Sequence, residues 1–417
     1  MGPEDWTPAR LGDCMEVLTG FPFASKSFSD GKNNVRLLRG DNIVQGGLRW
    51  DSAKCWPCND LEAYASWQLA EGDVVVAMDR PWIEAGLKHA RLQARDLPCL
   101  LVQRVARLRA DESMDQGFLF ALIASPAFTT HVLSVQTGTA VPHISARQIG
   151  DFKFLIPPLD EQRRIAGVLG ALDDKIEHTH TLVGRLRQVA DLRFRQLFLG
   201  SDERSRRSLS HVASLQRETV DPAEHPGELF EHFSIPAFDN GRWPALEVGA
   251  QILSGKTRLP RGDVILLSKL NPATPRVWWP RATARGEPVC SGEFVVLVPT
   301  EVPATFLYAS LRNDSALYDE ILSHATGTTG SRQRVKPSEV LSSSLLDAEA
   351  NELDVYDSFA RPVYDLEAAL IAESQHLSAI RDALLPRLIS GAVGVPDTYD
   401  PDDAIGTVAE AAVTAPP

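Results

Sequence analysis

Short apolar runs separated by turn residues mark two stretches of the chain as rich in strands. The clearest runs are 74–78 and 264–267, each of which follows a Gly-Asp turn, and brief continuous runs of this kind indicate buried strands. Further strands are expected at 100–102 and 294–298, and helical segments are expected at 117–133 and 304–323. Both stretches therefore have a mixed α+β pattern.

Two other stretches, 159–200 and 349–391, have the pattern of long helices. Their apolar positions recur at alternating steps of three and four residues over about four heptads, which is typical of a coiled coil. The first expected seam consists of Ile165, Leu169, Leu172, Ile176, Thr179, Val183, Leu186, Ala190, Arg193 and Leu197. The second consists of Tyr356, Phe359, Val363, Leu366, Leu370, Glu373, Leu377, Ile380 and Leu384. The alternative is that each helix packs only on its own domain.

The chain repeats itself at a separation of about 190 residues. The segment 69–75 (LAEGDVV) recurs as 259–265 (LPRGDVI), and the Gly-Thr pair at 138–139 recurs at 327–328. Two further matches lie in the long helices, at 186–191 with 377–382 and at 197–200 with 388–391. Matches that keep their order and nearly constant spacing indicate two similar domains, because the period is far too long for a solenoid.

The repeat and the two helices divide the chain into five parts. They are a mixed domain at 1–158, a helix at 159–200, a second mixed domain at 201–348, a second helix at 349–391 and a tail at 392–417. The tail combines four prolines and many alanines with no lysine or arginine. This composition predicts a disordered segment.

Net charge is −13, which argues against a protein that coats nucleic acid without selection. The excess of acidic residues is unevenly distributed along the chain. The segments 1–158 and 201–348 each carry 16 basic and 18 acidic residues, whereas 349–391 carries 3 basic and 8 acidic residues. Each mixed domain can therefore present a local basic face. Five cysteines form no disulfide framework, and the N-terminus has no secretory pattern, so we expect a reducing cytoplasm.

Sequence motifs for catalysis are missing. The chain has no glycine-rich cofactor loop paired with an Asn/Asp-Pro-Pro-aromatic motif, no P-loop and no Gly-x-Ser-x-Gly elbow. The Cys-Trp-Pro-Cys run at 55–58 has no second Cys or His pair nearby, which favours two loop thiols over a zinc or redox site. We therefore expect a non-catalytic chain that holds no metal and no cofactor of its own.

Several segments resemble the specificity subunits of type I restriction–modification systems. The runs GTAVPHIS at 138–145 and FLIPPLDEQRRIA at 154–166 look like the junction between a recognition domain and a spacer helix in that family. Other similar segments lie at 11–13, 20–28, 37–43, 232–238 and 267–278. The resemblance covers roughly 8–391, but the second junction, 345–353, lacks both Pro-Pro and Glu-Gln-Arg.

This resemblance implies a fold and a function. The fold would be α+β, with two similar mixed target-recognition domains separated by two long antiparallel coiled-coil helices, a rod of roughly 60 Å. The chain would read an asymmetric, two-part site on double-stranded DNA with an unread gap between the halves. The implied partners are two methyltransferase (M) subunits, which carry S-adenosylmethionine, and a restriction (R) subunit.

Candidate contact residues follow from the same layout. Arginine and lysine favour guanine, and glutamine or asparagine favours adenine, at base edges. The expected DNA-binding residues are Arg80, Lys88, His143, Lys269, Arg276, Arg332, Gln333 and Arg334. The expected partner-binding residues at the first junction are Glu161, Gln162, Arg163 and Arg164. Each of the DNA-binding candidates could instead be a solvated surface group or a phosphate contact.

Two other functions remain open from the sequence. One is a coiled-coil scaffold that assembles partners without reading DNA. The other is an enzyme of unrecognised type that acts alone on nucleic acid, and turnover by the isolated chain would distinguish it from both binding functions.

Overall fold

A computed structural model describes residues 3–29, 34–51, 53–138, 140–200, 204–327 and 333–395. The chain forms two compact units. Unit 1 consists of Met1–Lys175 and Leu377–Pro417, and unit 2 is Ile176–His376. Unit 1 is therefore discontinuous in sequence, and the whole of unit 2 lies between its two parts.

Unit 1 is built on a four-stranded antiparallel sheet in the order β2-β10-β5-β8. These strands are β2 (Met15–Thr19), β10 (Val105–Ala110), β5 (Val74–Ala77) and β8 (His89–Arg91). A three-stranded sheet has the order β4 (Cys55–Trp56), β3 (Val35–Leu38) and β9 (Cys99–Leu101). Two further sheets have two strands each: β1 (Thr7–Arg10) pairs with β11 (Lys153–Ile156), and β6 (Trp82–Ile83) pairs with β7 (Gly86–Leu87). The helices are α1 (Gln116–Ala124), α2 (Pro126–Val135) and α3 (Ala146–Gly150). All of β5 is buried, as its unbroken apolar run predicts.

Unit 2 repeats this plan and adds a larger sheet. Its four-stranded sheet has the order β13 (Ala213–Leu215), β21 (Phe294–Pro299), β18 (Ile265–Ser268) and β19 (Val277–Trp278). The five-stranded sheet has the order β14 (Thr219–Val220), β17 (Lys256–Arg258), β20 (Glu287–Cys290), β15 (Leu229–Phe233) and β16 (Ala245–Val248). A two-stranded sheet pairs β12 (Arg206–Ser208) with β22 (Ser344–Leu346). The shorter helices are α5 (Ile235–Asp239), α6 (Ala304–Asn313), α7 (Ser315–Ser323) and α8 (Pro337–Ser342).

The sheets bear out the duplication expected from the sequence. The central strand of each four-stranded sheet, β5 or β18, pairs antiparallel with the last long strand of its domain, β10 or β21. The pair β1–β11 in unit 1 corresponds to β12–β22 in unit 2, and each pair leads into a long helix. The expected α+β class with two similar domains is confirmed.

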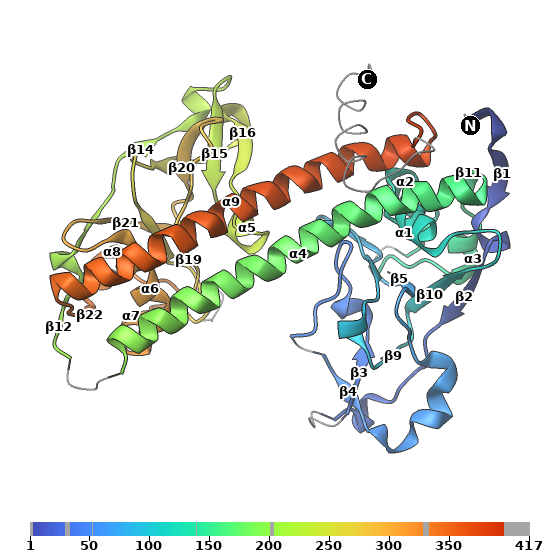
Figure 1. Ribbon diagram of the computed structural model, residues 1–417, viewed down its shortest axis with the longest axis horizontal. Coiled ribbons are helices and arrows are strands. Elements are labelled where there is room, and N and C mark those ends of the chain that lie inside the picture. The colour runs from blue at the N-terminus through green and yellow to red at the C-terminus, as the bar shows by residue number, and fades with distance from the viewer. Residues whose placement is uncertain are drawn as a thin grey trace. The chain divides into compact units, whose positions relative to one another are not determined.

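The two long helices are α4 (Leu159–Phe198) and α9 (Ala350–Ile389), each of 40 residues, and they run side by side in Figure 1. In unit 2, His180 Nε2 lies 2.8 Å from Ser374 Oγ, and Arg187 donates to Glu367 across 2.5 Å. Residue numbers on α9 fall as those on α4 rise, so the helices pair antiparallel. Both contacts are polar and one heptad apart. A slip by one heptad would separate the buried Glu367 carboxylate from Arg187, so this pair fixes the register.

The buried stripe of each helix differs in part from the expected seam. On α4 the seam is correct from Ile165 to Val183, but beyond Ala190 the buried residues are Phe194 and Phe198 rather than Arg193 and Leu197. These two aromatic rings pack into the core of unit 2, and this contact, rather than a heptad repeat, sets which face is buried. The end of the first expected seam was therefore wrong.

On α9 the expected seam was correct at Tyr356, Leu377 and Leu384, which are buried, and wrong at several positions between Tyr356 and Leu377. Phe359, Leu366 and Glu373 are exposed, and the buried stripe in unit 2 includes Tyr356, Ala360, Tyr364, Glu367 and Ser374. The buried glutamate and serine hid the true stripe, because a search for apolar positions passes over polar residues that are paired inside an interface.

Other expectations meet the structure only in part. Of the tail, 392–395 is described, with Val395 buried, and 396–417 lies outside the described residues. Cys55 is a half-buried free thiol, and the side chain of Cys58 lies outside the described part. Among the described residues, no group of His, Cys, Asp or Glu is placed to hold a metal ion. No single described helix has the length and apolarity to cross a membrane; α1 and α2 meet those criteria only as a pair bent by 63°.

Gly20 lies where two backbones approach closely, and this generates a first prediction. A Cβ at this position would lie 2.1 Å from the carbonyl oxygen of Val102, which cannot move aside without disturbing the sheet. We expect Gly20→Ala to lower the free energy of unfolding by about 3 kcal/mol. The matched control is Gly170→Ala in α4, where the added methyl meets nothing within 4 Å and should raise stability by about 0.5–1 kcal/mol. Denaturant unfolding of both variants checks this, and similar losses in both would contradict it.

His89 predicts a pH dependence of stability. Burial lowers the pKa of His89 to about 4 from the usual 6.5, although its hydrogen bond to the Leu87 carbonyl opposes the shift. Between these values the unfolded chain binds a proton that the folded chain excludes, so stability falls as the pH decreases. We expect a loss of about 2–3 kcal/mol between pH 7 and pH 4.5 from this group. His89→Gln should show a correspondingly weaker dependence in denaturant unfolding, and parallel curves for the two proteins would refute the assignment.

Candidate nucleic-acid interface

A groove of about 700 Å³ in unit 1 collects charged residues from the ends of several strands. Phe23 and Phe28 supply apolar wall, and Gln103 supplies an amide. The charged lining residues are Arg39, Asp41, Asp79, Arg80, Lys88 and Arg104. Four cations against two carboxylates make the groove basic in a chain whose net charge is −13. A basic groove of this kind suits the phosphates and base edges of DNA.

Two of the expected DNA-binding residues, Arg80 and Lys88, line this groove. Arg80 follows β5 with a φ of 44°, and its backbone N–H donates to the Pro142 carbonyl across 2.7 Å. Its side chain is exposed, whereas Lys88 is half-buried. Burial lowers the pKa of Lys88, and the neighbouring Arg80 lowers it further while Asp41 opposes the shift. Both side chains can therefore meet a ligand in the groove.

His143 reaches the same strand end from the loop that follows α2. Thr137 and His143 exchange two backbone hydrogen bonds, of 2.9 and 2.8 Å, which close the loop. His143 Nδ1 lies 2.6 Å from Asp79 Oδ1, and Arg104 donates to the other oxygen of that carboxylate. Burial alone would raise the pKa of Asp79, but the hydrogen bonds from His143 and Arg104 outweigh it and hold the pKa below its usual value. Asp79 is therefore a carboxylate shared by the His143 imidazole and the Arg104 guanidinium.

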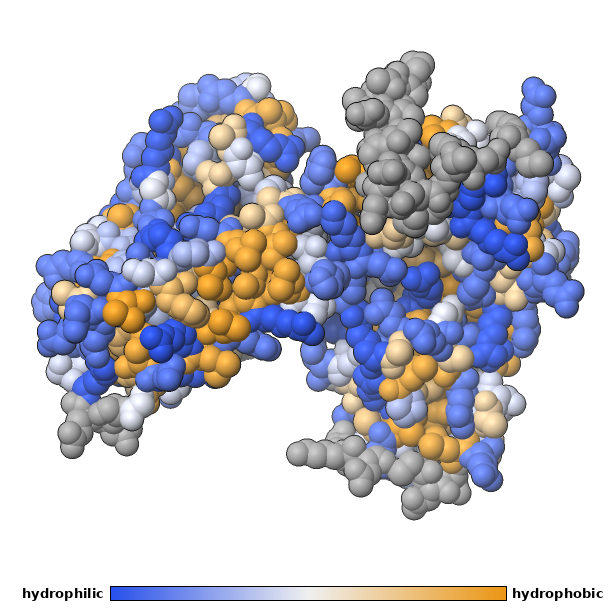
Figure 2. Space-filling view, in the orientation of Figure 1, coloured by the Kyte–Doolittle hydropathy of each residue, from blue (hydrophilic) through white to orange (hydrophobic). Residues whose placement is uncertain are grey.

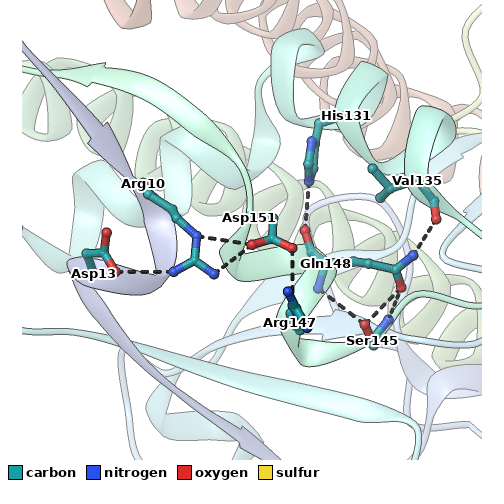
Figure 3. A network of polar contacts seen from close by, with 8 residues as sticks. All are labelled: Arg10, Asp13, His131, Val135, Ser145, Arg147, Gln148 and Asp151. Carbon is teal, nitrogen blue, oxygen red and sulfur yellow. Dashed lines mark hydrogen bonds and ion pairs between the residues drawn. The ribbon is translucent and has the colours of Figure 1, made fainter.

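The base of this loop is fixed by the network drawn in Figure 3. Ser145 caps α3, and its backbone N–H donates to Gln148 Oε1 across 2.8 Å. Gln148 Nε2 in turn donates to the Val135 carbonyl, and His131 contacts the Gln148 carbonyl across 2.7 Å. These bonds tie α2 to α3, so the loop between them starts and ends on rigid elements.

The corresponding loop of unit 2 holds three of the expected DNA-binding residues. Lys269 follows β18, and Asn271 N–H donates to the Gln333 carbonyl across 2.9 Å. Arg334 pairs with Glu293 through two hydrogen bonds of 3.0 and 3.1 Å, which hold the pKa of Glu293 below its usual value. Lys269, Gln333 and Arg334 therefore meet at one strand end.

The remaining candidates are placed differently. The side chain of Arg276 is only 15% exposed, and its guanidinium forms two hydrogen bonds to Asp239, of 2.8 and 2.9 Å. It is therefore engaged within unit 2. Arg332 lies outside the described residues. Sequence reasoning did not single out Arg39 or Arg104, although Arg39 stands in the 37–43 segment and Arg104 directly precedes β10.

The first junction differs from the expected partner-binding surface. Glu161 is buried and accepts a hydrogen bond from Trp6 Nε1 across 3.3 Å. Gln162 is also buried, and its amide bonds the backbone of Asp115 and Pro157. Both residues fasten the start of α4 to the rest of unit 1. Glu161 pairs with a buried indole N–H, and Gln162 satisfies backbone groups that would otherwise be buried unpaired.

The other two members of that set lie closer to solvent. Arg163 is exposed and pairs with Asp160 across 3.1 Å, and Arg164 is half-buried. Glu161 and Gln162 therefore lie inside unit 1, whereas Arg163 and part of Arg164 face solvent. A role of these residues in binding a partner stays a prediction.

Comparisons with known proteins match the first part of the chain. The family model of the type I restriction modification DNA specificity domain matches residues 3–186. The chain is 32% identical over 180 residues to the type I restriction enzyme EcoAI specificity subunit of Escherichia coli, which is 43% of this chain and 30% of that protein. It is also 32% identical over 176 residues to the MjaVIII specificity subunit of Methanocaldococcus jannaschii, 42% of this chain and 41% of that protein. The matches thus span less than half the length of these curated relatives.

Solved structures extend the likeness in fold. The S subunit of a type I restriction–modification system from M. genitalium superposes with a TM-score of 0.57 at 13% identity, over 94% of this chain and 97% of that one. At this identity the likeness concerns the fold alone. The resemblance indicated by the sequence is confirmed: residues 3–186 of this chain match the family model of the type I restriction modification DNA specificity domain.

Proposed function

We propose that the chain is the DNA-specificity subunit of a type I restriction–modification complex. Its two domains would bind the two parts of an asymmetric site on double-stranded DNA, and the chain would hold the subunits that modify or cut that DNA. It would perform no catalysis itself. One observation carries the proposal: both units hold a loop against the end of the central strand by the same backbone bonds, yet present different polar side chains there.

The chemistry of the two strand ends supports reading of sequence as well as binding of the backbone. In unit 1 the groove offers Arg80, Lys88 and Arg104, and in unit 2 the loop offers Gln333 and Arg334. Cations on flexible stems bind phosphate, whereas arginine and glutamine side chains held at fixed points discriminate base edges in the major groove. Because the two sets differ, the two half-sites should differ as well.

An apolar patch on the long helices supports partner binding. Figure 2 shows orange side chains gathered over the parts of α4 and α9 that belong to unit 2. Its members are between 38% and 61% exposed: Val189, Leu192, Val355, Phe359 and Leu366. The guanidinium of Arg193 on α4 lies 6.0 Å from the ring of Phe359 on α9, so the two helices meet beside this residue of the patch. Grouped large apolar side chains on a surface are typical of protein interfaces.

We assign this patch to a methyltransferase subunit. The full complex would contain two such subunits, each carrying S-adenosylmethionine, and a restriction subunit. The cofactor would thus stay on the partners. Since the DNA and these partners are in the cytoplasm, the chain would act there.

Mapping of methylated bases tests the DNA-reading role. The chain is co-expressed with its methyltransferase subunit, and methylated adenines are located across the host genome by single-molecule sequencing. We expect one asymmetric two-part motif with a gap of fixed length, which disappears when the chain is omitted. An unchanged methylation pattern in its absence would refute the DNA-reading role and favour a scaffold that assembles partners without reading DNA.

Substitutions in the apolar patch test the partner surface. We expect Phe359→Ser combined with Leu366→Ser to weaken co-purification of the methyltransferase subunit at least about tenfold, because two apolar contacts of roughly 1 kcal/mol or more are lost. Thermal stability of the isolated chain should change little, since both side chains are already exposed. The control is Leu253→Ser, which removes an 85% exposed leucine elsewhere in unit 2. Equal effects of the control and the patch variant would contradict the assignment.

A further inference from the structure

The two units share a set of backbone hydrogen bonds around the end of the central strand. Three bonds have counterparts about 190 residues apart, and each is 2.7–3.2 Å long. In unit 1 the backbone N–H groups of Met78, Arg80 and Ile144 donate to the carbonyls of Arg104, Pro142 and Met78, respectively. In unit 2 the counterparts, in the same order, are Lys269, Asn271 and Val335, which donate to the carbonyls of Glu293, Gln333 and Lys269. These bonds make His143 equivalent to Arg334, and Arg104 equivalent to Glu293.

The side chains at the equivalent positions differ, but one relation between them is retained. In unit 1 the loop residue His143 contacts Asp79, which lies at the strand end. In unit 2 the position of Asp79 is taken by Leu270, and the loop cation Arg334 contacts Glu293 instead, from the turn before β21. His143 and Arg334 therefore each have an acidic partner, although the acid comes from a different element in each unit.

Asp79 and Glu293 are not needed to close the two loops. Two backbone hydrogen bonds between Thr137 and His143, and two between Thr326 and Arg334, already close each loop. The Asp79–His143 and Glu293–Arg334 pairs also lie partly in solvent, where even an ion pair contributes little to stability. His143 is 41% exposed and Arg334 52% exposed, so one edge of each side chain is held while the other stays open.

The atoms of His143 and Arg334 that bond the acids determine which of their other atoms remain available to a ligand. Arg334 uses Nε and Nη2 on Glu293, which leaves Nη1 and the second hydrogen of Nη2 as a free two-pronged donor. Such a fork matches O6 and N7 of guanine. His143 directs Nδ1 toward Asp79 and leaves Nε2 for a base edge. Holding a side chain in one orientation before binding reduces the entropy lost on binding and excludes alternative contacts.

We propose that Asp79 and Glu293 are positioning residues for DNA reading, which orient His143 and Arg334 toward a base pair in the first and second half-site respectively. The inference rests on the proposed function. It assigns a guanine to the pair that Arg334 contacts, and it makes the acid a determinant of specificity rather than of overall affinity.

Methylation of a duplex library randomised across each half-site tests this, with the complex of the chain and its methyltransferase subunit. We expect Arg334→Ala to lower the preference for one guanine at least tenfold, and Glu293→Gln to lower it several-fold at the same base pair only. The double variant should lose no more than Arg334→Ala alone, because both changes disable one contact. His143→Ala and Asp79→Asn should behave in the same way in the other half-site.

Controls separate positioning from folding and from the proposed function. Glu301→Gln removes the acid of the Arg207–Glu301 pair in unit 2 and should leave every base preference unchanged. Glu293→Asp, which keeps a carboxylate, should restore part of the guanine preference lost in Glu293→Gln. If Glu293→Gln leaves the guanine preference intact, weakens all base pairs equally, or adds to Arg334→Ala, the positioning role is overturned. If the unaltered complex methylates no motif that depends on this chain, the proposed function itself fails.

Discussion

An isolated helix of 40 residues leaves its apolar stripe exposed to water, so each long helix needs other elements that bury this stripe. The packing of the long helices and the packing of the domains are therefore linked. In unit 2 the stripe of α4 ends on Phe198, whose ring lies 5.0 Å from Phe306 of α6 and 5.7 Å from Tyr356 of α9. These side chains belong to one buried cluster with the inner faces of β18 and β21. The sheet, the short helices and the long helices of unit 2 therefore depend on one another for burial.

The sequence predicted those parts of the fold that are set by pattern. The bounds of both long helices were within two residues of the observed ones, and the central strands were placed correctly because an unbroken apolar run is buried on both faces. The part of the α9 seam between Tyr356 and Leu377 could not be found in this way, since Glu367 and Ser374 are buried while Phe359 and Leu366 are exposed. A polar side chain can be buried only where it has a hydrogen-bond or ion-pair partner. The spacing of apolar residues along one helix does not reveal such a partner on another helix.

The sequence predicted the loops of the candidate site, but not the acids beside them. Arg80 and Lys88 line one groove, whereas Asp79 and Glu293 could not be singled out, because the side chains that they contact, His143 and Arg334, lie 64 and 41 residues away in sequence. Glu161 and Gln162 stand in the motif that carries the family resemblance, yet they are buried in unit 1. A recurrent motif can therefore mark a structural joint, and burial distinguishes it from a contact surface.

The discontinuity of unit 1 has a consequence for synthesis of the chain. The first part of unit 1 leaves the ribosome early, but the residues of α9 that belong to it begin at Leu377, after the whole of unit 2. Arg381, which pairs with Asp173 across 3.1 Å, and Leu384 and Leu388, which are fully buried, are among the last described residues to appear. Until they do, the segment of α4 from Leu159 to Lys175 lacks its partner helix. Unit 2 can therefore complete its fold on the nascent chain before unit 1, reversing the usual order in which N-terminal domains fold first.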